Sequence, residues 1–205
     1  MIKTFAKAIL AGVMIGIGGI VYLSAENKVV GAFLFSFGLF TIVRSGFALY
    51  TGKVGYIPEN KPSYILEVLT TLAGNIAGTG LTALILRFTR IWDKIHTTAV
   101  GIMDGKTADS VPSQFILGIF CGMLMYFAVE NGKNCRDKSD VSFVFGICVP
   151  VMIFILSGFN HSVADCFYYF SANPDFRGAL YILTVALGNA LGGMFIPTVK
   201  KLIKE

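Results

Sequence analysis

The sequence predicts an all-α integral membrane protein whose six membrane-spanning helices form two related halves. Hydrophobic residues make up 55% of the 205-residue chain and charged residues 14%, and the mean hydropathy is +0.71. These values lie far from the balance of a soluble domain. The tripeptide Ser-Gly-Phe also occurs twice inside strongly apolar segments, at residues 45–47 and 157–159. Composition therefore predicts a membrane protein, and the duplication predicts an internal repeat.

Six segments are apolar over about the twenty residues that a helical membrane span needs. The first lacks an obvious small-residue cleavage site and is interpreted as a retained span, not as a signal peptide. The connections are short and polar, so residues 1–205 are expected to form a single transmembrane domain. The expected spans are about residues 5–24, 29–51, 64–87, 111–130, 141–169 and 178–199.

Two further landmarks accompany the repeated tripeptide in the same order. A Gly-Asn-x-x-Gly element follows each copy, with Asn75 in the first half and Asn189 in the second. We therefore expect a first repeat at about residues 1–90 and a second at about 106–205. Three spans per half is an odd number, so the second repeat is expected to be inverted in the membrane, as in many transporters and channels. The upstream landmark aligns Gly12 and Gly16 with Gly118 and Gly122.

The second and fifth spans are expected to be broken at their Ser-Gly pairs, because glycine permits the backbone to leave helical geometry. Backbone groups that are freed at bilayer depth must be buried in protein or line a cavity. If a half-helix restarts there, its first N–H groups favour an anion. The alternative is that each Ser-Gly pair is a close-packing site between helices. The Gly-Asn elements are interpreted as helix contacts whose asparagine can satisfy the backbone of a broken neighbour.

His161 is the most informative single residue, because an ionisable group inside a membrane span is a functional hypothesis by default. Imidazole titrates near neutral pH, so His161 could hand a proton to a weak-acid anion, which would then cross the apolar path as a neutral species. The other histidine, His96, lies in a polar segment that is expected to be a solvated loop. Arg44 stands in the second-span break, where a vestibule position and an ion pair with Asp165 or Glu67 are both open.

Basic residues in the predicted loops indicate the orientation of the chain. The side that holds both termini carries more of them, which predicts cytoplasmic termini. The net charge of +5 therefore reflects topology and does not indicate nucleic-acid binding. The basic residues on the side of the termini are Lys3, Lys7, Lys53, Lys61, Lys133, Arg136, Lys138, Lys200, Lys201 and Lys204. Those on the opposite side are Lys28, Arg87, Arg90, Lys94, Lys106 and Arg177.

The four cysteines, Cys121, Cys135, Cys148 and Cys166, have no C-x-x-C spacing, and three lie in apolar segments. They are interpreted as buried free thiols. We expect no metal and no cofactor.

The chain resembles the formate/nitrite transporter family over nearly its whole length. The resemblance implies an aquaporin-like protomer, a homopentamer with one pore per protomer in the plasma (inner) membrane, and passage of small monovalent anions such as formate, nitrite or hydrosulfide. The matching pieces are residues 35–39 and 49–52, Gly74, Asn75 and Gly78, Lys106 before the fourth span, residues 157–164, and Gly188, Asn189 and Gly192.

The resemblance also implies roles for single residues. Thr51 is similar to the threonine that hydrogen-bonds the central histidine, and His161 resembles that histidine. Lys106 falls where the family places a basic residue that draws anions towards the vestibule. Asn160, where an acidic residue is common, belongs to the same substrate pathway, and Asp165 stands where asparagine is common. Hydrophobic constrictions are expected at Phe35, Leu39, Leu49, Phe154 and Met125.

Gly122 and Met125 stand where related chains tend to have Asn and Val. The resemblance therefore implies that one polar group near the pore is missing.

The preferred function is a channel or transporter for a small monovalent weak-acid anion, linked to a proton through His161. An aquaporin-like channel for neutral small solutes is the alternative. A haem or redox subunit is less favoured because one histidine within a span gives little for bis-histidine ligation. An enzyme is least favoured because no catalytic or metal-ligand cluster is legible at membrane depth.

Overall fold

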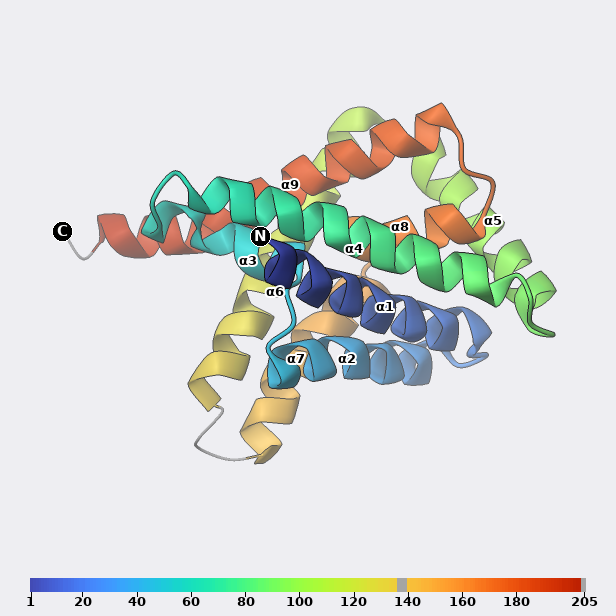
Figure 1. Cartoon of the computed structure of the whole chain (residues 1–205), viewed down its shortest axis with the longest axis horizontal. Coiled ribbons are helices and arrows are strands. Elements are labelled where there is room, and N and C mark those ends of the chain that lie inside the picture. Colours follow the sequence, from blue (N-terminus) through green and yellow to red (C-terminus); the bar gives the residue numbers. More distant parts are fainter. Residues whose placement is uncertain (136–139, 204–205) are drawn as a thin grey trace.

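The computed structural model describes residues 1–135 and 140–203, which form α-helices and one 3₁₀ helix (Figure 1). Cys121, Cys148 and Cys166 are buried free thiols, as expected. The side chain of Cys135 lies outside the described residues, as do Arg136, Lys138 and Lys204.

The first half of the chain has its second predicted span in two pieces. Helix α2 ends at Ser45, and helical structure resumes at Tyr50. Helices α1 and α4 run side by side, and α2 packs against α1 (Figure 1). The elements are α1 (Ile2–Ser24), α2 (Lys28–Ser45), α3 (Tyr50–Lys53), the 3₁₀ helix η1 (Val54–Glu59) and α4 (Tyr64–Leu86).

The second half repeats this arrangement. Its second span, predicted over residues 141–169, is divided into α7 and α8. Helix α6 packs against α9, just as α1 packs against α4. The elements are α6 (Val111–Cys135), α7 (Asp140–Leu156), α8 (Ser162–Ser171) and α9 (Phe176–Leu202).

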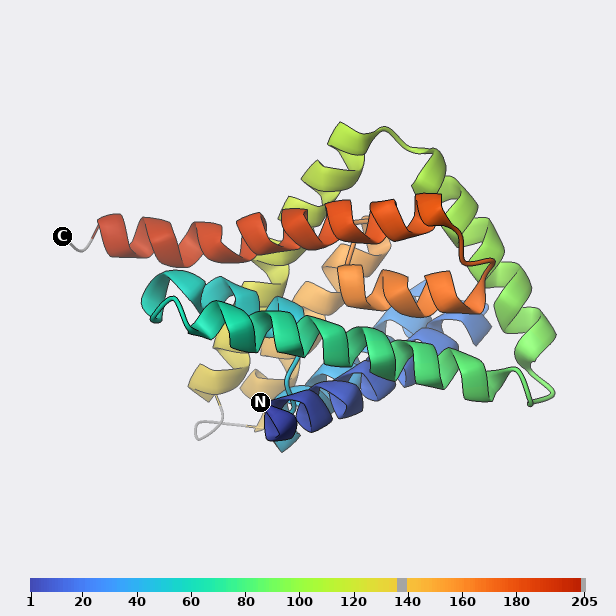
Figure 2. The same cartoon turned by 45° about the horizontal axis from the view of Figure 1, so that its top comes forward.

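Between the halves lies α5 (Trp92–Ala108), which the hydropathy pattern does not predict because it is much more polar than the spans. It runs across one end of the helix bundle (Figure 2). His96 lies on α5, half-buried, with its ring stacked on Trp92 at 5.1 Å between centroids and its Nδ1 2.9 Å from the Ser171 carbonyl oxygen. The prediction of a solvated loop histidine is therefore wrong.

The outer faces of the helices are suited to lipid. Among the described residues, α1, α2, α4, α6 and α9 are long and apolar enough to cross a membrane, and the apolar part of α7, Val141–Leu156, is shorter. Such a large exposed apolar surface is a liability in water and indicates contact with lipid or with another protomer. Its members include Phe33, Phe37, Leu66, Leu84, Phe145, Leu183 and Leu187.

Both helix breaks begin at a glycine in the left-handed conformation. Gly46 has φ +66° and Gly158 has φ +71°, a region that residues with a Cβ rarely adopt. The residue after each glycine then closes the preceding helix with the same type of hydrogen bond. These bonds are Phe47 N–H to Ile42 O at 3.0 Å and Phe159 N–H to Phe154 O at 2.9 Å. Both predicted breaks are therefore present at the predicted Ser-Gly pairs.

One asparagine in each half holds the chain beyond the break. The Asn75 side chain on α4 donates to the carbonyls of Ala8 and Ala48, both at 2.8 Å, and accepts the Tyr50 N–H at 2.8 Å. The Asn189 side chain on α9 makes the equivalent bonds, to Gly118 O at 2.8 Å, Asn160 O at 2.9 Å and Ser162 N at 2.9 Å. The prediction that asparagine satisfies the backbone of a broken neighbour is confirmed.

These contacts correct the alignment of the two halves upstream of the breaks. Gly12, and not Gly16, corresponds to Gly122, because a Cβ at Gly12 would lie 2.4 Å from the Asn75 carbonyl oxygen and a Cβ at Gly122 would lie 2.3 Å from that of Asn189. In each half the two glycines are one helical turn apart, so the halves can be aligned in two ways that differ by one turn. The alignment by sequence similarity used the wrong one. Since no side chain fits at Gly122, the helix crossing explains the missing polar group there.

We predict that Asn75→Leu and Asn189→Leu each strongly destabilise the protein. Each substitution leaves one N–H and two carbonyls of a buried segment without their side-chain partner, and a buried unsatisfied group costs about 1–3 kcal/mol. Thermal unfolding of the detergent-solubilised protein measures the effect, with Asn173→Leu at an exposed position as the matched control. Midpoints that equal the control midpoint would show that the asparagines do not support the breaks.

Candidate functional site

His161 and Thr51 form a polar pair where the two broken segments meet. His161 directly precedes α8 and is 2% exposed, and Thr51 on α3 is 1% exposed. Thr51 Oγ1 lies 3.0 Å from His161 Nε2. The structure thus brings together the two residues that the resemblance assigned to the centre of the pathway.

His161 also caps the helix that follows it. The backbone N–H of Ala164 donates to His161 Nδ1 at 3.1 Å. A backbone amide can only donate, so Nδ1 holds a lone pair, and the proton of the neutral ring lies on Nε2, facing Thr51. A second proton on the ring would require Nδ1 to release the Ala164 amide.

Large apolar side chains surround this polar pair. The rings of Phe154 and His161 stack with centroids 5.2 Å apart, and Phe35 packs edge to face on Phe154 at 6.2 Å. None of these apolar groups can replace the water shell of an ion, so the barrier opposes a hydrated charge. All five residues expected at constrictions are buried in one cluster: Phe35, Leu39, Leu49, Met125 and Phe154.

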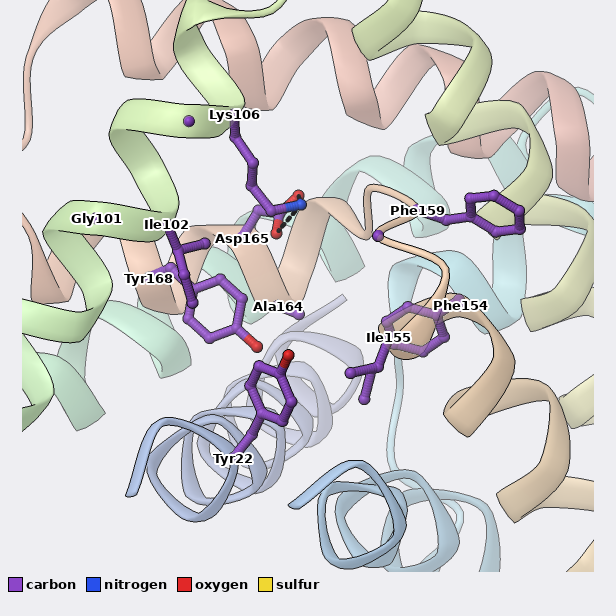
Figure 3. A pocket seen from close by; sticks show the side chains of 12 residues that line it. Tyr22, Gly101, Ile102, Lys106, Phe154, Ile155, Phe159, Ala164, Asp165 and Tyr168 are labelled. Atoms are coloured by element: carbon purple, nitrogen blue, oxygen red, sulfur yellow. Dashed lines mark hydrogen bonds and ion pairs between the residues drawn. The ribbon is translucent and has the colours of Figure 1, made fainter. Parts of the chain in front are cut away.

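Two cavities approach this barrier from its two sides. The Lys53 vestibule, of about 430 Å³, is lined by Leu39 and Leu49 near the barrier and by Lys53 farther out. The Lys106 vestibule, of about 370 Å³, is lined by Phe154 near the barrier and by Lys106 (Figure 3). His161 lines neither cavity, and its ring stacks on that of Phe154, which lines the Lys106 vestibule.

Three of the amides that start the half-helices are bound by protein side chains. The Tyr50 N–H is taken by Asn75, the Ser162 N–H by Asn189, and the Ala164 N–H by His161. Helix α3 is also only four residues long, so its dipole is small. These three amides are therefore not free for an anion, and the Thr51 hydroxyl and the His161 ring add side-chain hydrogen-bonding groups at the two helix ends.

Lys106 enters its vestibule from α5 and is held by two side chains (Figure 3). Its Nζ donates to Asn160 Oδ1 at 2.7 Å and lies 3.3 Å from Asp165 Oδ1. Asp165 is 2% exposed and accepts a hydrogen bond from the Tyr181 hydroxyl at 2.6 Å. A buried carboxylate thus balances the charge of the lysine in this cavity.

Asp165 and Tyr181 are site residues that the sequence did not reveal. A carboxylate at bilayer depth calls for a partner, and the spacing of one helical turn from His161 places Asp165 on the same half-helix. The sequence suggests Arg44 as the partner of Asp165. Because helix α5 is not predicted, the approach of Lys106 to Asp165 cannot be seen from the sequence.

Arg44 does not line either vestibule, although its neighbours Val43 and Gly46 line the Lys53 vestibule. Its side chain is exposed in the last turn of α2, with the guanidinium 5.9 Å from the centroid of the Phe143 ring. Each of the two acids considered as its partner is paired with a lysine instead. A cation in the last turn of a helix is favoured by the helix dipole, which accounts for this position without a pore role.

The Lys53 vestibule also places its cations against protein partners. Lys53 forms an ion pair with Glu67, and the Lys133 Nζ lies 3.5 Å from the centroid of the Tyr56 ring. The Tyr56 hydroxyl donates to Glu130 Oε2 at 2.6 Å. Burial raises the pKa of Tyr56, and the bond to Glu130 raises it further, so the phenol stays neutral.

Sequence comparisons relate the chain to formate channels. The family model described as "Formate/nitrite transporter" matches residues 1–202. Formate channel FocA of Escherichia coli (strain K12) is 27% identical over 186 residues, which cover 81% of this chain and 65% of FocA. The chain thus spans about two thirds of the length of this curated relative. A probable formate transporter of Methanothermobacter thermautotrophicus is 27% identical over 235 residues, covering 93% of this chain and 84% of that protein.

Solved structures share the fold. A structure titled "Pentameric formate channel with formate bound" is 25% identical and superposes with a TM-score of 0.81 over 98% of this chain and 96% of that one. A structure titled "FNT family ion channel" has the same fold at 20% identity, with a TM-score of 0.84 over 100% of this chain and 90% of that one. Because the family model covers residues 1–202 of 205, the chain belongs to the formate/nitrite transporter family.

Proposed function

We propose that the protein is a channel or transporter for small monovalent weak-acid anions of the formate, nitrite or hydrosulfide class, and that a proton accompanies the anion by way of His161. The observation that carries the proposal is the His161–Thr51 pair, buried in an apolar barrier between two vestibules that contain lysines. Relatives described as formate channels support an anion and do not favour the alternative of an aquaporin-like channel for neutral solutes.

The apolar barrier makes the passage of an ion costly, and the His161–Thr51 pair lowers that cost. A charge that leaves water for an apolar passage loses its hydration, which is costly unless it gains hydrogen bonds or becomes neutral. Within the barrier, an anion that opens the bond between Thr51 Oγ1 and His161 Nε2–H gains both groups as donors. A weak-acid anion that acquires a proton there crosses the flanking phenylalanine and leucine side chains as a neutral molecule.

The cap on α8 ties proton movement to local structure. The neutral ring presents Nε2–H to the pathway, and its second nitrogen is occupied by the Ala164 amide. The ring therefore gives its Nε2 proton to the anion while Nδ1 releases the amide and takes a proton from water. Loss of the Nδ1 proton to water and uptake of a proton at Nε2 then restore the starting tautomer and let the amide return.

We also propose an aquaporin-like arrangement of inverted repeats that assembles as a homopentamer in the plasma (inner) membrane. Three spans per half and the equivalent bonds of Asn75 and Asn189 support the inverted repeat. The pentameric state of the formate-bound relative and the apolar outer faces support assembly. The excess of basic residues on the side of the termini supports cytoplasmic termini.

The central role of His161 is tested with His161→Asn in proteoliposomes. Asparagine can still cap α8 but does not titrate, so we expect formate flux to fall about tenfold, the effect of losing one hydrogen bond to a charged group. The remaining flux should carry no proton. Formate uptake and internal pH, recorded together, give the number of protons moved per formate.

Thr51→Val should also lower formate flux, because it removes the hydroxyl that faces His161 Nε2. Thr97→Val, the same change on the exposed face of α5, should leave flux unaltered. A His161→Asn protein with the flux and proton ratio of the unmodified protein would exclude the proposed role.

The charge balance around Lys106 predicts a rescue by exchange of two side chains. Asn160→Asp adds a carboxylate where Lys106 Nζ now donates at 2.7 Å, so it should lower flux at subsaturating formate. A unit charge roughly 8 Å from the anion at a dielectric constant of about 20 contributes about 2 kcal/mol, which corresponds to about tenfold or more. Asp165→Asn leaves Lys106 without its carboxylate and should change flux in the opposite direction.

The double variant Asn160→Asp with Asp165→Asn restores the net charge by isosteric changes and should return flux to near that of the unmodified protein. Flux is measured at low and high ionic strength, because an electrostatic effect weakens with salt. If Asn160→Asp alone transports like the unmodified protein, the charge of this cluster does not act on the anion.

A further inference from the structure

The Lys106 vestibule contains two tyrosine hydroxyls that take no part in the contacts described so far. Tyr22 comes from the last turn of α1 and Tyr168 from α8, and both line the cavity of about 370 Å³. Figure 3 shows the two hydroxyl oxygens pointing toward one another. Tyr168 is 5% exposed and Tyr22 is half-buried, so most of each side chain is covered while the hydroxyls line the cavity.

Both hydroxyls are free to donate. Within residues 1–135 and 140–203, neither has a hydrogen-bond partner, and they are not bonded to each other. Other enclosed tyrosines are paired: Tyr50 donates to the Ala186 carbonyl at 3.0 Å, and Tyr181 donates to Asp165. Because an enclosed tyrosine hydroxyl ordinarily has a partner, two unpaired donors facing one another indicate a place for a ligand.

The charges around this pair favour an anion. Asp165, which also lines the cavity, is balanced by Lys106 and does not present an unpaired negative charge. The Lys28 ammonium lies 4.9 Å from the centroid of the Tyr22 ring and donates to main-chain carbonyls. No carboxylate among the described residues pairs with Lys28. The positive charge beside the Tyr22 ring is therefore not cancelled.

We propose that Tyr22 and Tyr168 form an anion-binding subsite that holds the transported ion before it reaches His161, an inference that rests on the proposed function. The ligand is a small monovalent oxyanion, such as a carboxylate, whose oxygens accept one hydrogen bond from each phenol. Neutral donors suit a transport path, because an ion must bind well enough to enter and weakly enough to leave. The apolar rings of Phe154 and Phe159 in the same cavity offer the ion no hydrogen bonds, so the two phenols replace part of the water that it loses there.

The subsite is tested by formate flux in proteoliposomes that contain Tyr22→Phe, Tyr168→Phe or the double variant. Each single change removes one hydrogen bond to a charged ligand, so the formate concentration that gives half-maximal flux should rise about tenfold. The double variant should show a larger rise, with the maximal flux maintained. Tyr169→Phe is the matched control, because the Tyr169 hydroxyl donates to the Asp175 carbonyl at 3.0 Å, and its half-saturating concentration should not change.

Direct binding gives a second measurement that does not depend on transport. The line width of ¹³C-formate is recorded with the detergent-purified protein, after size-exclusion chromatography has shown that each variant assembles as the unmodified protein does. Broadening by the unmodified protein and by Tyr169→Phe, with little broadening by the double variant, supports the subsite. Unchanged half-saturation and unchanged broadening in the double variant overturn it and leave the proposed function standing.

The two proposals can also fail separately. If the unmodified protein carries no formate, nitrite or hydrosulfide, the proposed function is wrong, and the line widths still decide the subsite. Broadening that is lost in the double variant then supports anion binding at the tyrosines. No broadening by the unmodified protein overturns it.

Discussion

The structure depends on satisfying the backbone of two helices that are interrupted inside the membrane. At that depth no water is available to pair the freed N–H and C=O groups, so each interruption needs a partner from the protein. Asn75 and Asn189 each supply one acceptor and two donors to the backbone around one opening. The glycine contacts between α1 and α4, and between α6 and α9, bring these amides close enough to reach. The rest of the pathway is built on this support.

The two halves hold their interruptions in the same way but place different side chains there. The residue that precedes each half-helix is extended in both halves, with φ −110° at Leu49 and φ −113° at His161. In the first half this position contributes an apolar wall, and in the second half it contributes a ring that binds Thr51 and caps its own helix. The two halves therefore share an extended backbone at this position. The polar ring beside Thr51 comes from the second half, which has histidine where the first half has leucine.

The sequence predicts the breaks and their support well, because both follow from local rules. A Ser-Gly pair inside an apolar segment locates the left-handed residues Gly46 and Gly158, and a buried asparagine has few uses other than pairing backbone groups. The register upstream of the breaks is not determined, since glycines one turn apart fit in two ways. The Lys106–Asp165–Tyr181 cluster joins three helices. No spacing along the chain encodes such a meeting, and the polar composition of α5 conceals its helix.

Helix α5 connects the two repeats without belonging to either. It lies across one end of the bundle (Figure 2) and lends Lys106 to a cavity whose other charged group, Asp165, comes from the second repeat. The bonds that Asn75 and Asn189 make to the interruptions involve no residue of α5, whose Lys106 contacts the second interruption through the Asn160 side chain. Substitutions on α5 can therefore change the charge of the Lys106 vestibule while the bonds of Asn75 and Asn189 stay intact. Family members with the same core are thus free to differ in the residues that line this vestibule.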